Sequence, residues 1–178
     1  MMKQIEYKDK LYYLGFTLDI IMSKVNHLFH VGTNTIDDNV YKITFMTIEK
    51  ESTSSKYALD IYINEENKNQ LFDTIEYILS DENNIDETEV VFSNRIDCHN
   101  RVYYKLSQFI DTDCGDLGSM FINMILKIYR DKNFVVIEPK VSYSYLLATK
   151  DLDVKFYPVL LSDNIINEIK SNCEKQYK

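Results

Sequence analysis

The sequence predicts an α+β fold: a mostly antiparallel sheet with about four helices packed largely on one face. Three observations predict it. The chain has 178 residues, 45% of them hydrophobic, which suits a single globular domain over residues 1–178. Segments in which apolar and polar residues alternate come in pairs, as antiparallel strands do. A segment with apolar residues at helical spacing follows each pair.

The first predicted helix covers residues 14–29. The apolar residues at helical spacing are Leu14, Leu18, Ile21, Met22, Val25, Leu28 and Phe29. A strand over residues 12–22 is the alternative. The apolar residues that alternate there are Tyr12, Leu14, Phe16, Leu18, Ile20 and Met22. Val25 and Leu28 do not continue this alternation, which favours the helix.

Several short segments are predicted as strands because β-branched and aromatic residues alternate with polar ones. In chain order they cover residues 40–49, 56–63, 89–92, 101–110, 134–138, 141–147 and 154–161. The first two are separated by a short polar stretch, which predicts a hairpin. Runs of strands between single helices favour antiparallel pairing over a doubly wound parallel sheet.

Three further helices are predicted over residues 65–79, 117–130 and 163–174, where apolar residues recur at helical spacing. Asn64 precedes the first of these helices and Ser162 precedes the last, and both residue types are good N-caps. Together with the helix predicted over residues 14–29, these are the four expected helices.

Negative charge is concentrated in one part of the chain. The sequence has 28 Asp and Glu against 20 Lys and Arg, a formal net charge of -8. Residues 60–89 hold ten of these acids and a single base, Lys68. The other acids and bases nearly cancel, so the net charge lies in one predicted helix and the loop after it. Such a block attracts a basic protein and repels nucleic acid.

This acidic block is the predicted partner-binding surface. Its proposed contact residues are Asp73, Glu76, Asp81, Glu82, Asp86, Glu87 and Glu89. Tyr62 and Tyr77 lie beside these acids and offer anchoring area for a partner. The alternative interpretation is a solvated helix face and a loop kept soluble by its acids.

Two patterns resemble metal sites but fail on spacing, so no metal is predicted. His27 and His30 would share a helical face, yet no nearby Cys or His completes a ligand set. Residues 111–116 are rich in Asp, as calcium loops are. However, Gly115 stands where a ligand is needed, and Ile122 stands where the loop requires Glu.

Enzymatic signals are weak. Cys114 precedes a predicted helix and His99 is a conceivable base for it, which leaves a small cysteine- or histidine-dependent hydrolase as an alternative function. No phosphate-binding glycine loop, nucleotide fingerprint or C-x-x-C motif is present, so no cofactor is expected. The three cysteines, Cys98, Cys114 and Cys173, are widely spaced, which favours a reducing compartment.

The first apolar stretch, residues 11–22, is interrupted by Thr17 and Asp19 and lacks a cleavage site. No other stretch has the length of a membrane helix, so we expect a cytoplasmic protein without membrane contact.

Together these features predict a stoichiometric protein-binding inhibitor rather than an enzyme. In character, though in no motif, the chain is similar to immunity proteins that neutralise interbacterial nuclease toxins by covering a basic cleft with acidic residues. Its expected partner is therefore a basic protein, either a toxin or a nuclease, with no direct nucleic-acid contact. A phage or mobile-element anti-defence inhibitor that mimics nucleic acid is the alternative, from another class.

Overall fold

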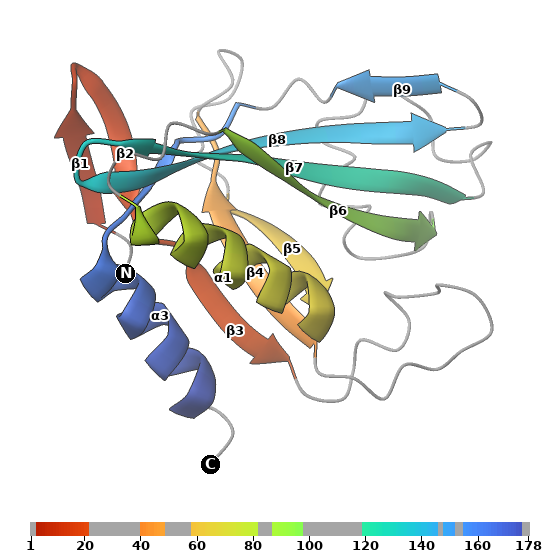
Figure 1. Cartoon of the computed structure of the whole chain (residues 1–178). Helices are drawn as coiled ribbons and strands as arrows, with labels where there is room; N and C mark the ends of the chain where they lie inside the picture. Colours follow the sequence, from red (N-terminus) through yellow and green to blue (C-terminus); the bar gives the residue numbers. More distant parts are fainter. Residues whose placement is uncertain are drawn as a thin grey trace.

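The structure is a computed structural model that describes residues 3–21, 40–48, 58–81, 87–97, 119–145, 148–151 and 155–175. Within these ranges the chain forms two sheets and two helices (Figure 1). The strands of the larger sheet are β1 (Lys3–Tyr7), β2 (Lys10–Leu14), β6 (Thr88–Asp97), β7 (Ser119–Asp131), β8 (Phe134–Tyr145), β9 (Ala148–Asp151) and β10 (Val159–Leu161). The smaller sheet contains β3 (Thr17–Ile21), β4 (Val40–Met46) and β5 (Ala58–Asn64). The helices are α1 (Glu65–Ser80) and α3 (Asp163–Lys175).

The larger sheet has the strand order β1-β2-β10-β8-β7-β6. Its pairs are antiparallel except β2 with β10, which run parallel. Strand β8 is long enough to take two partners on one edge. Its first part pairs with β10 through residues 135–137, and its last part pairs with β9 through residues 142–145. Residues 138–140 of β8, which lie between these two partners, line a groove described below.

The smaller sheet is an antiparallel meander in the order β3-β4-β5, joined to the larger sheet at two places. At Gly15 the chain passes from β2 to β3 with a φ of 77°, a conformation that favours glycine. At the other junction, residues 155–157 run beside the end of β4. There the Tyr157 amide donates a hydrogen bond to the Met46 carbonyl oxygen at 3.0 Å, and the Ile48 amide donates to the Lys155 carbonyl oxygen at 2.7 Å.

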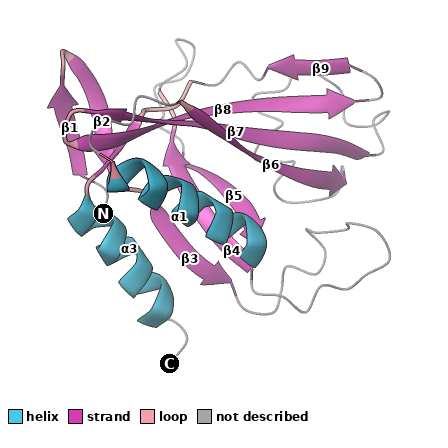
Figure 2. Ribbon diagram, viewed as in Figure 1, coloured by secondary structure: helices cyan, strands magenta, loops and turns pink. Residues whose placement is uncertain are grey.

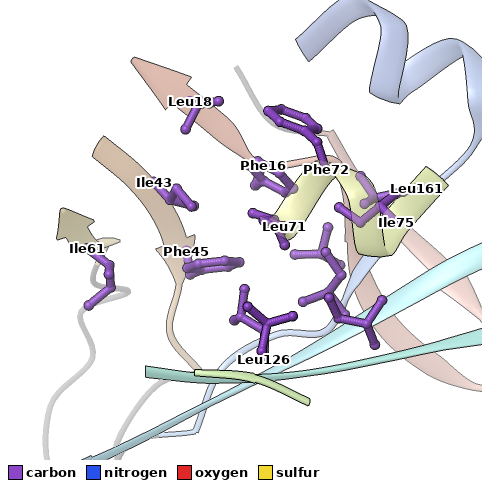
Figure 3. Packing of buried hydrophobic residues seen from close by; sticks show 14 of the residues in the cluster. Phe16, Leu18, Ile43, Phe45, Ile61, Leu71, Phe72, Ile75, Leu126 and Leu161 are labelled. Carbon is purple, nitrogen blue, oxygen red and sulfur yellow. The ribbon is translucent and has the colours of Figure 1, made fainter. Parts of the chain in front are cut away.

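The main hydrophobic core lies between the two sheets and the two helices. Helix α1 fills its centre with Leu71, Ile75 and Ile78, which are fully buried. Figure 3 shows Leu71 and Phe72 directed towards Phe16 at the start of the smaller sheet. A second, smaller cluster forms on the opposite face of the larger sheet. Its buried members are Tyr12, Val136 and Leu160.

The predicted set of about four helices is wrong: the described residues contain two, and strands make up most of them (Figure 2). Of the helix predicted over residues 14–29, Leu14 instead ends β2 and Thr17–Ile21 form β3. The alternative, one strand over residues 12–22, is right about the extended backbone but is divided at Gly15 and Phe16 between two sheets. Burial of Phe16 and Leu18 follows the strand period. The remainder of that predicted helix lies outside the described residues.

The helix predicted over residues 117–130 is also wrong, because residues 119–131 form strand β7. Met124, Leu126 and Ile128 point into the main core and are buried. Ile125 and Tyr129, which alternate with them, lie on the other face, where Tyr129 packs against the second cluster. When both faces of a strand carry apolar residues, an i, i+3, i+4 pattern arises without a helix.

Other predicted elements are confirmed. The hairpin over residues 40–49 and 56–63 is β4 and β5. The helices over residues 65–79 and 163–174 are α1 and α3. The division into two strands predicted over residues 134–138 and 141–147 is wrong, because residues 134–145 form one continuous strand, β8. The strand predicted over residues 101–110 lies outside the described ranges.

Candidate functional site

Helix α1 presents an outward face that carries much of the predicted binding surface. It follows β5 without a break, so its direction is set by the smaller sheet. Its inward side chains are buried, whereas Asp73, Glu76, Tyr77 and Asp81 are exposed. We call these four residues the acidic helix face. Tyr77 is 60% exposed, the most of any exposed large hydrophobic side chain among the described residues.

Cations from distant parts of the chain reduce the negative charge that the sequence concentrates here. Lys170 of α3 forms an ion pair with Glu76 and lies 5.3 Å from the Phe72 ring centroid. Lys127 of β7 forms an ion pair with Glu87, with 3.1 Å between Nζ and Oε2. The local field is therefore weaker than residues 60–89 alone imply.

Lys68, the single base within the block, turns inward. Its Nζ lies 4.5 Å from the Tyr41 ring centroid and 3.2 Å from the Tyr41 hydroxyl, and the ring is buried. Glu65 pairs with it at 3.7 Å. Because Lys68 faces the smaller sheet, it does not interrupt the acidic helix face.

The structure divides the predicted contact set into two groups. Asp73, Glu76 and Asp81 belong to the acidic helix face. Glu89 lies on the opposite face of the larger sheet, because Val90 and Phe92 point into the core beside α1 and neighbouring strand residues alternate. Glu87 belongs to the same group as Glu89, because it pairs with Lys127. Glu82 and Asp86 lie outside the described residues.

A groove that the sequence did not predict lies beside β8 and has a volume of about 840 Å³. Its apolar lining includes Leu11 and Ile48, which are 47% and 39% exposed. Its cationic lining consists of Lys10, Lys127, Lys140 and Lys155. We call it the lysine-rimmed groove. Six separate chain segments form it, so no local sequence pattern could have identified it.

The one cysteine within the described residues, Cys173, is not exposed to a substrate. Cys173 is buried in the main core, and burial raises the pKa of its thiol. Cys98, Cys114 and His99, on which the hydrolase alternative depends, lie outside the described residues, as do His27 and His30. No group of three or more His, Cys, Asp or Glu side chains fit to hold a metal occurs in the ranges given above.

Neither described helix is long and apolar enough to cross a membrane. Comparisons of the chain with protein-family models, with curated proteins and with solved structures find no match.

Proposed function

We propose that this protein is a stoichiometric inhibitor that docks the acidic helix face on a basic protein, in the manner of an immunity protein acting on a nuclease-type toxin. The observation that carries the proposal is the position of Tyr77. A large aromatic side chain, 60% exposed, shares a helix with the carboxylates of Asp73 and Glu76, and Asp81 directly follows the end of that helix. Exposed tyrosines beside complementary charge are typical anchors of protein interfaces.

The rigidity of α1 supports this role. Leu71, Ile75 and Ile78 are fully buried beneath the exposed face. Arg130 of β7 donates hydrogen bonds to the carbonyl oxygens of Ile78 and Leu79 in the last turn. A surface that is already fixed loses little conformational entropy on binding, so more of the contact energy contributes to affinity.

The carboxylates differ in what they offer a partner. Glu76 is paired with Lys170, so an incoming cation must compete with an existing interaction. Asp73 is exposed and forms no ion pair with any described residue, and it lies one turn before Tyr77. We expect Tyr77 to supply most of the affinity and Asp73 to steer the association.

The nucleic-acid-mimicking alternative is less well supported. A mimic needs an unbroken acidic surface to imitate a phosphate backbone. Here Lys170 and Lys127 pair with Glu76 and Glu87, and Glu89 lies on another side of the molecule from Asp73. The smaller, mixed surface on α1 suits a protein partner.

The test begins with a tagged protein incubated in lysate of its native host at low and moderate salt. The retained basic protein is purified, its nuclease activity is measured, and the inhibitor is titrated into that assay. We expect inhibition to be complete at a fixed stoichiometry, and Tyr77→Ala to weaken binding by about tenfold or more. Asp73→Lys should slow association chiefly at low salt.

Glu6→Lys provides the matched control, because Glu6 is an exposed acid on β1, away from α1. It makes the same change of net charge as Asp73→Lys. If both reversals slow association equally, net charge rather than the acidic helix face drives the encounter. If Tyr77→Ala leaves the affinity unchanged, the proposed surface is wrong.

A further inference from the structure

Four lysines in the described part of the chain lie over an aromatic ring, and each of them also pairs with a carboxylate. The sets of lysine, ring and acid are Lys8, Tyr7 and Asp131; Lys68, Tyr41 and Glu65; Lys127, Tyr129 and Glu87; and Lys170, Phe72 and Glu76. The distance from Nζ to the ring centroid lies between 4.5 and 5.5 Å. The face of a ring and a carboxylate attract the same cation, so the two interactions reinforce each other.

Helix α1 shows how such a set is built on a helix. Phe72 and Glu76 are four residues apart, so they lie one turn apart on the same side of α1. Lys170 of α3 supplies the cation, because its ammonium group pairs with Glu76 and lies 5.3 Å from the Phe72 ring centroid. Phe72 is buried, and the cation that covers it belongs to the chain itself.

The next such pair along α1 has the ring and the carboxylate but no cation. Asp73 and Tyr77 are also four residues apart, and both are exposed. No lysine or arginine among the described residues pairs with Asp73 or lies over the Tyr77 ring. We call Asp73 and Tyr77 the open pair. Because both side chains face solvent, a cation that completes this pair comes from another molecule.

The surroundings of the open pair also favour a cation. Glu66 and Asp81 are exposed, the first in the first turn of α1 and the second just after its end. The nearest cation supplied by the fold, Lys170, is held by Glu76 and Phe72. An arriving cation therefore meets net negative charge, which favours its approach.

We propose that the open pair binds an arginine side chain of the basic partner. The guanidinium group stacks on the Tyr77 ring, and its N–H groups donate hydrogen bonds to the Asp73 carboxylate. This inference rests on the function proposed for α1 and names the residue type that the partner contributes. Arginine is favoured over lysine because a planar guanidinium keeps its flat face on a ring while its edge donates sideways to a carboxylate. Asp73 is one methylene shorter than Glu76, so it reaches less far towards an ammonium group over the ring.

Three labelled octapeptides test this inference with the whole chain. Glycine alternates with arginine in the first, with lysine in the second and with citrulline in the third, and each carries fluorescein. Their affinities are measured by anisotropy at low salt. We expect the arginine peptide to bind about two- to fivefold more tightly than the lysine peptide, which has the same charge. The citrulline peptide, which keeps the shape of arginine without its charge, should show no binding.

Variants of the open pair locate the bound arginine. Tyr77→Phe should retain the preference for arginine over lysine because it keeps the ring, whereas Tyr77→Leu should abolish the preference. Asp73→Asn should weaken binding of the arginine peptide and reduce the preference. The matched control is Glu168→Gln, which removes the same charge from an exposed position on α3. Its neighbours one turn away, Asn164 and Asn172, carry no ring, so the preference should be unchanged.

A stacked arginine also has a spectroscopic signature. In proton NMR spectra of the arginine peptide, the δ-methylene protons should shift upfield as protein is added, because they lie over the face of the Tyr77 ring. Tyr77→Leu should abolish this shift, and Glu168→Gln should retain it.

Two results would overturn the inference: equal affinities for the arginine and lysine peptides, or a preference for arginine that survives Tyr77→Leu. Its failure is distinguishable from failure of the proposed function. If the basic protein retained from lysate binds Tyr77→Leu as tightly as Tyr77→Phe but binds Tyr77→Ala weakly, α1 docks without a stacked arginine. If that protein binds Tyr77→Ala as it binds the unchanged chain, the docking face is wrong whatever the peptides show.

Discussion

The guanidinium group of Arg130 donates a hydrogen bond to the backbone carbonyl oxygen of Ile78, 52 residues earlier in the chain, at 3.1 Å. A second bond reaches the carbonyl oxygen of Leu79 at 3.3 Å. The last turn of α1 contains no basic residue of its own. A cation of the larger sheet therefore supplies the charge and the donors that the carbonyl end of a helix requires.

Replacing Arg130 by Met should consequently destabilise the protein. Hydrogen bonds from a charged donor to part-buried carbonyls contribute about 1.5–3 kcal/mol, and we expect a loss at the lower end of that range. Urea unfolding measures it. Arg130→Lys retains the charge but not the planar guanidinium, in which Nη1 donates to the helix end while Nε donates to the Lys132 carbonyl oxygen, so an intermediate loss is expected. Equal losses for Met and Lys would show that geometry alone matters, and no loss for either would contradict the capping role.

Tyr7 and Tyr129 form a natural comparison between an unpaired and a paired hydroxyl. The Tyr7 hydroxyl is buried without a hydrogen-bond partner among the described residues, while its ring packs edge-on against Tyr12 and Phe134. The Tyr129 hydroxyl donates to Glu138 at 2.7 Å. Tyr7→Phe should be neutral or stabilising, because it removes an unsatisfied polar atom.

Tyr129→Phe should destabilise the fold by about 1 kcal/mol or slightly more, because Glu138 loses a donor. Denaturant unfolding of both variants gives their free energies of unfolding, provided that both curves are fitted with the same dependence on denaturant concentration. A Tyr7→Phe variant that is the less stable of the two would contradict this assignment of the hydroxyls.

Stability should fall in alkaline solution. Burial raises the pKa of Tyr129, assisted by its hydrogen bond to Glu138, and burial also raises the pKa of Tyr12. The folded state thus favours the neutral phenols. Their contribution is complete below the ordinary tyrosine pKa of about 10 and is lost as the pH rises beyond it. Urea midpoints should therefore be nearly constant around pH 8, begin to fall from about pH 9 as the Cys173 thiol of the unfolded chain ionises, and fall further above about pH 10.

Tyr129→Phe provides the control. The quantity to compare is the loss of stability between about pH 8 and pH 11, not the stability at pH 8. Tyr129→Phe should begin less stable at pH 8 and then lose less with rising pH, because one of the responsible groups is gone. A variant curve parallel to that of the unchanged protein would mean that other groups cause the alkaline loss.

Gly15 should resist replacement. Its φ of 77° lies in the left-handed region, and an added Cβ would lie 3.0 Å from Cγ2 of Ile165 on α3. Gly15→Ala should cost about 1–2 kcal/mol through backbone strain and crowding. Ile165→Ala removes the crowding atom, so the double variant should lose less than the sum of the two single losses. Strict additivity would assign the whole cost to the backbone.

How far the sequence predicts this fold depends on whether a segment has one apolar face or two. Helices α1 and α3 were predicted because each has a single apolar stripe, for example Leu71, Ile75 and Ile78. Strand β7 was not, because Ile125 on its second face completes a helical pattern with Met124 and Ile128.

The candidate site shows the same division between local and long-range information. Asp73 and Tyr77 share a helix, so sequence spacing alone placed them together. The position of Glu89 on the other side of the sheet follows from its alternation with Val90, which was visible in the sequence. The pairing of Lys170 with Glu76 was not visible, because only tertiary packing brings α3 beside α1.

That pair leads to a prediction that separates local charge from net charge. Lys170→Gln should reduce stability by less than about 1 kcal/mol, because the pair is partly exposed and such pairs contribute little. It should nevertheless make the acidic helix face more negative by releasing Glu76. The affinity for fluorescein-labelled octalysine is measured by anisotropy. At low salt Lys170→Gln should bind octalysine more tightly than the unchanged protein does, and at high salt the two affinities should be equal. Lys175→Gln removes the same charge from the end of α3 and serves as the control. An equal effect of both substitutions would show that octalysine responds to the net charge of the chain, whereas an effect of Lys170→Gln alone would locate the cation-binding surface at Glu76 and its neighbours on α1.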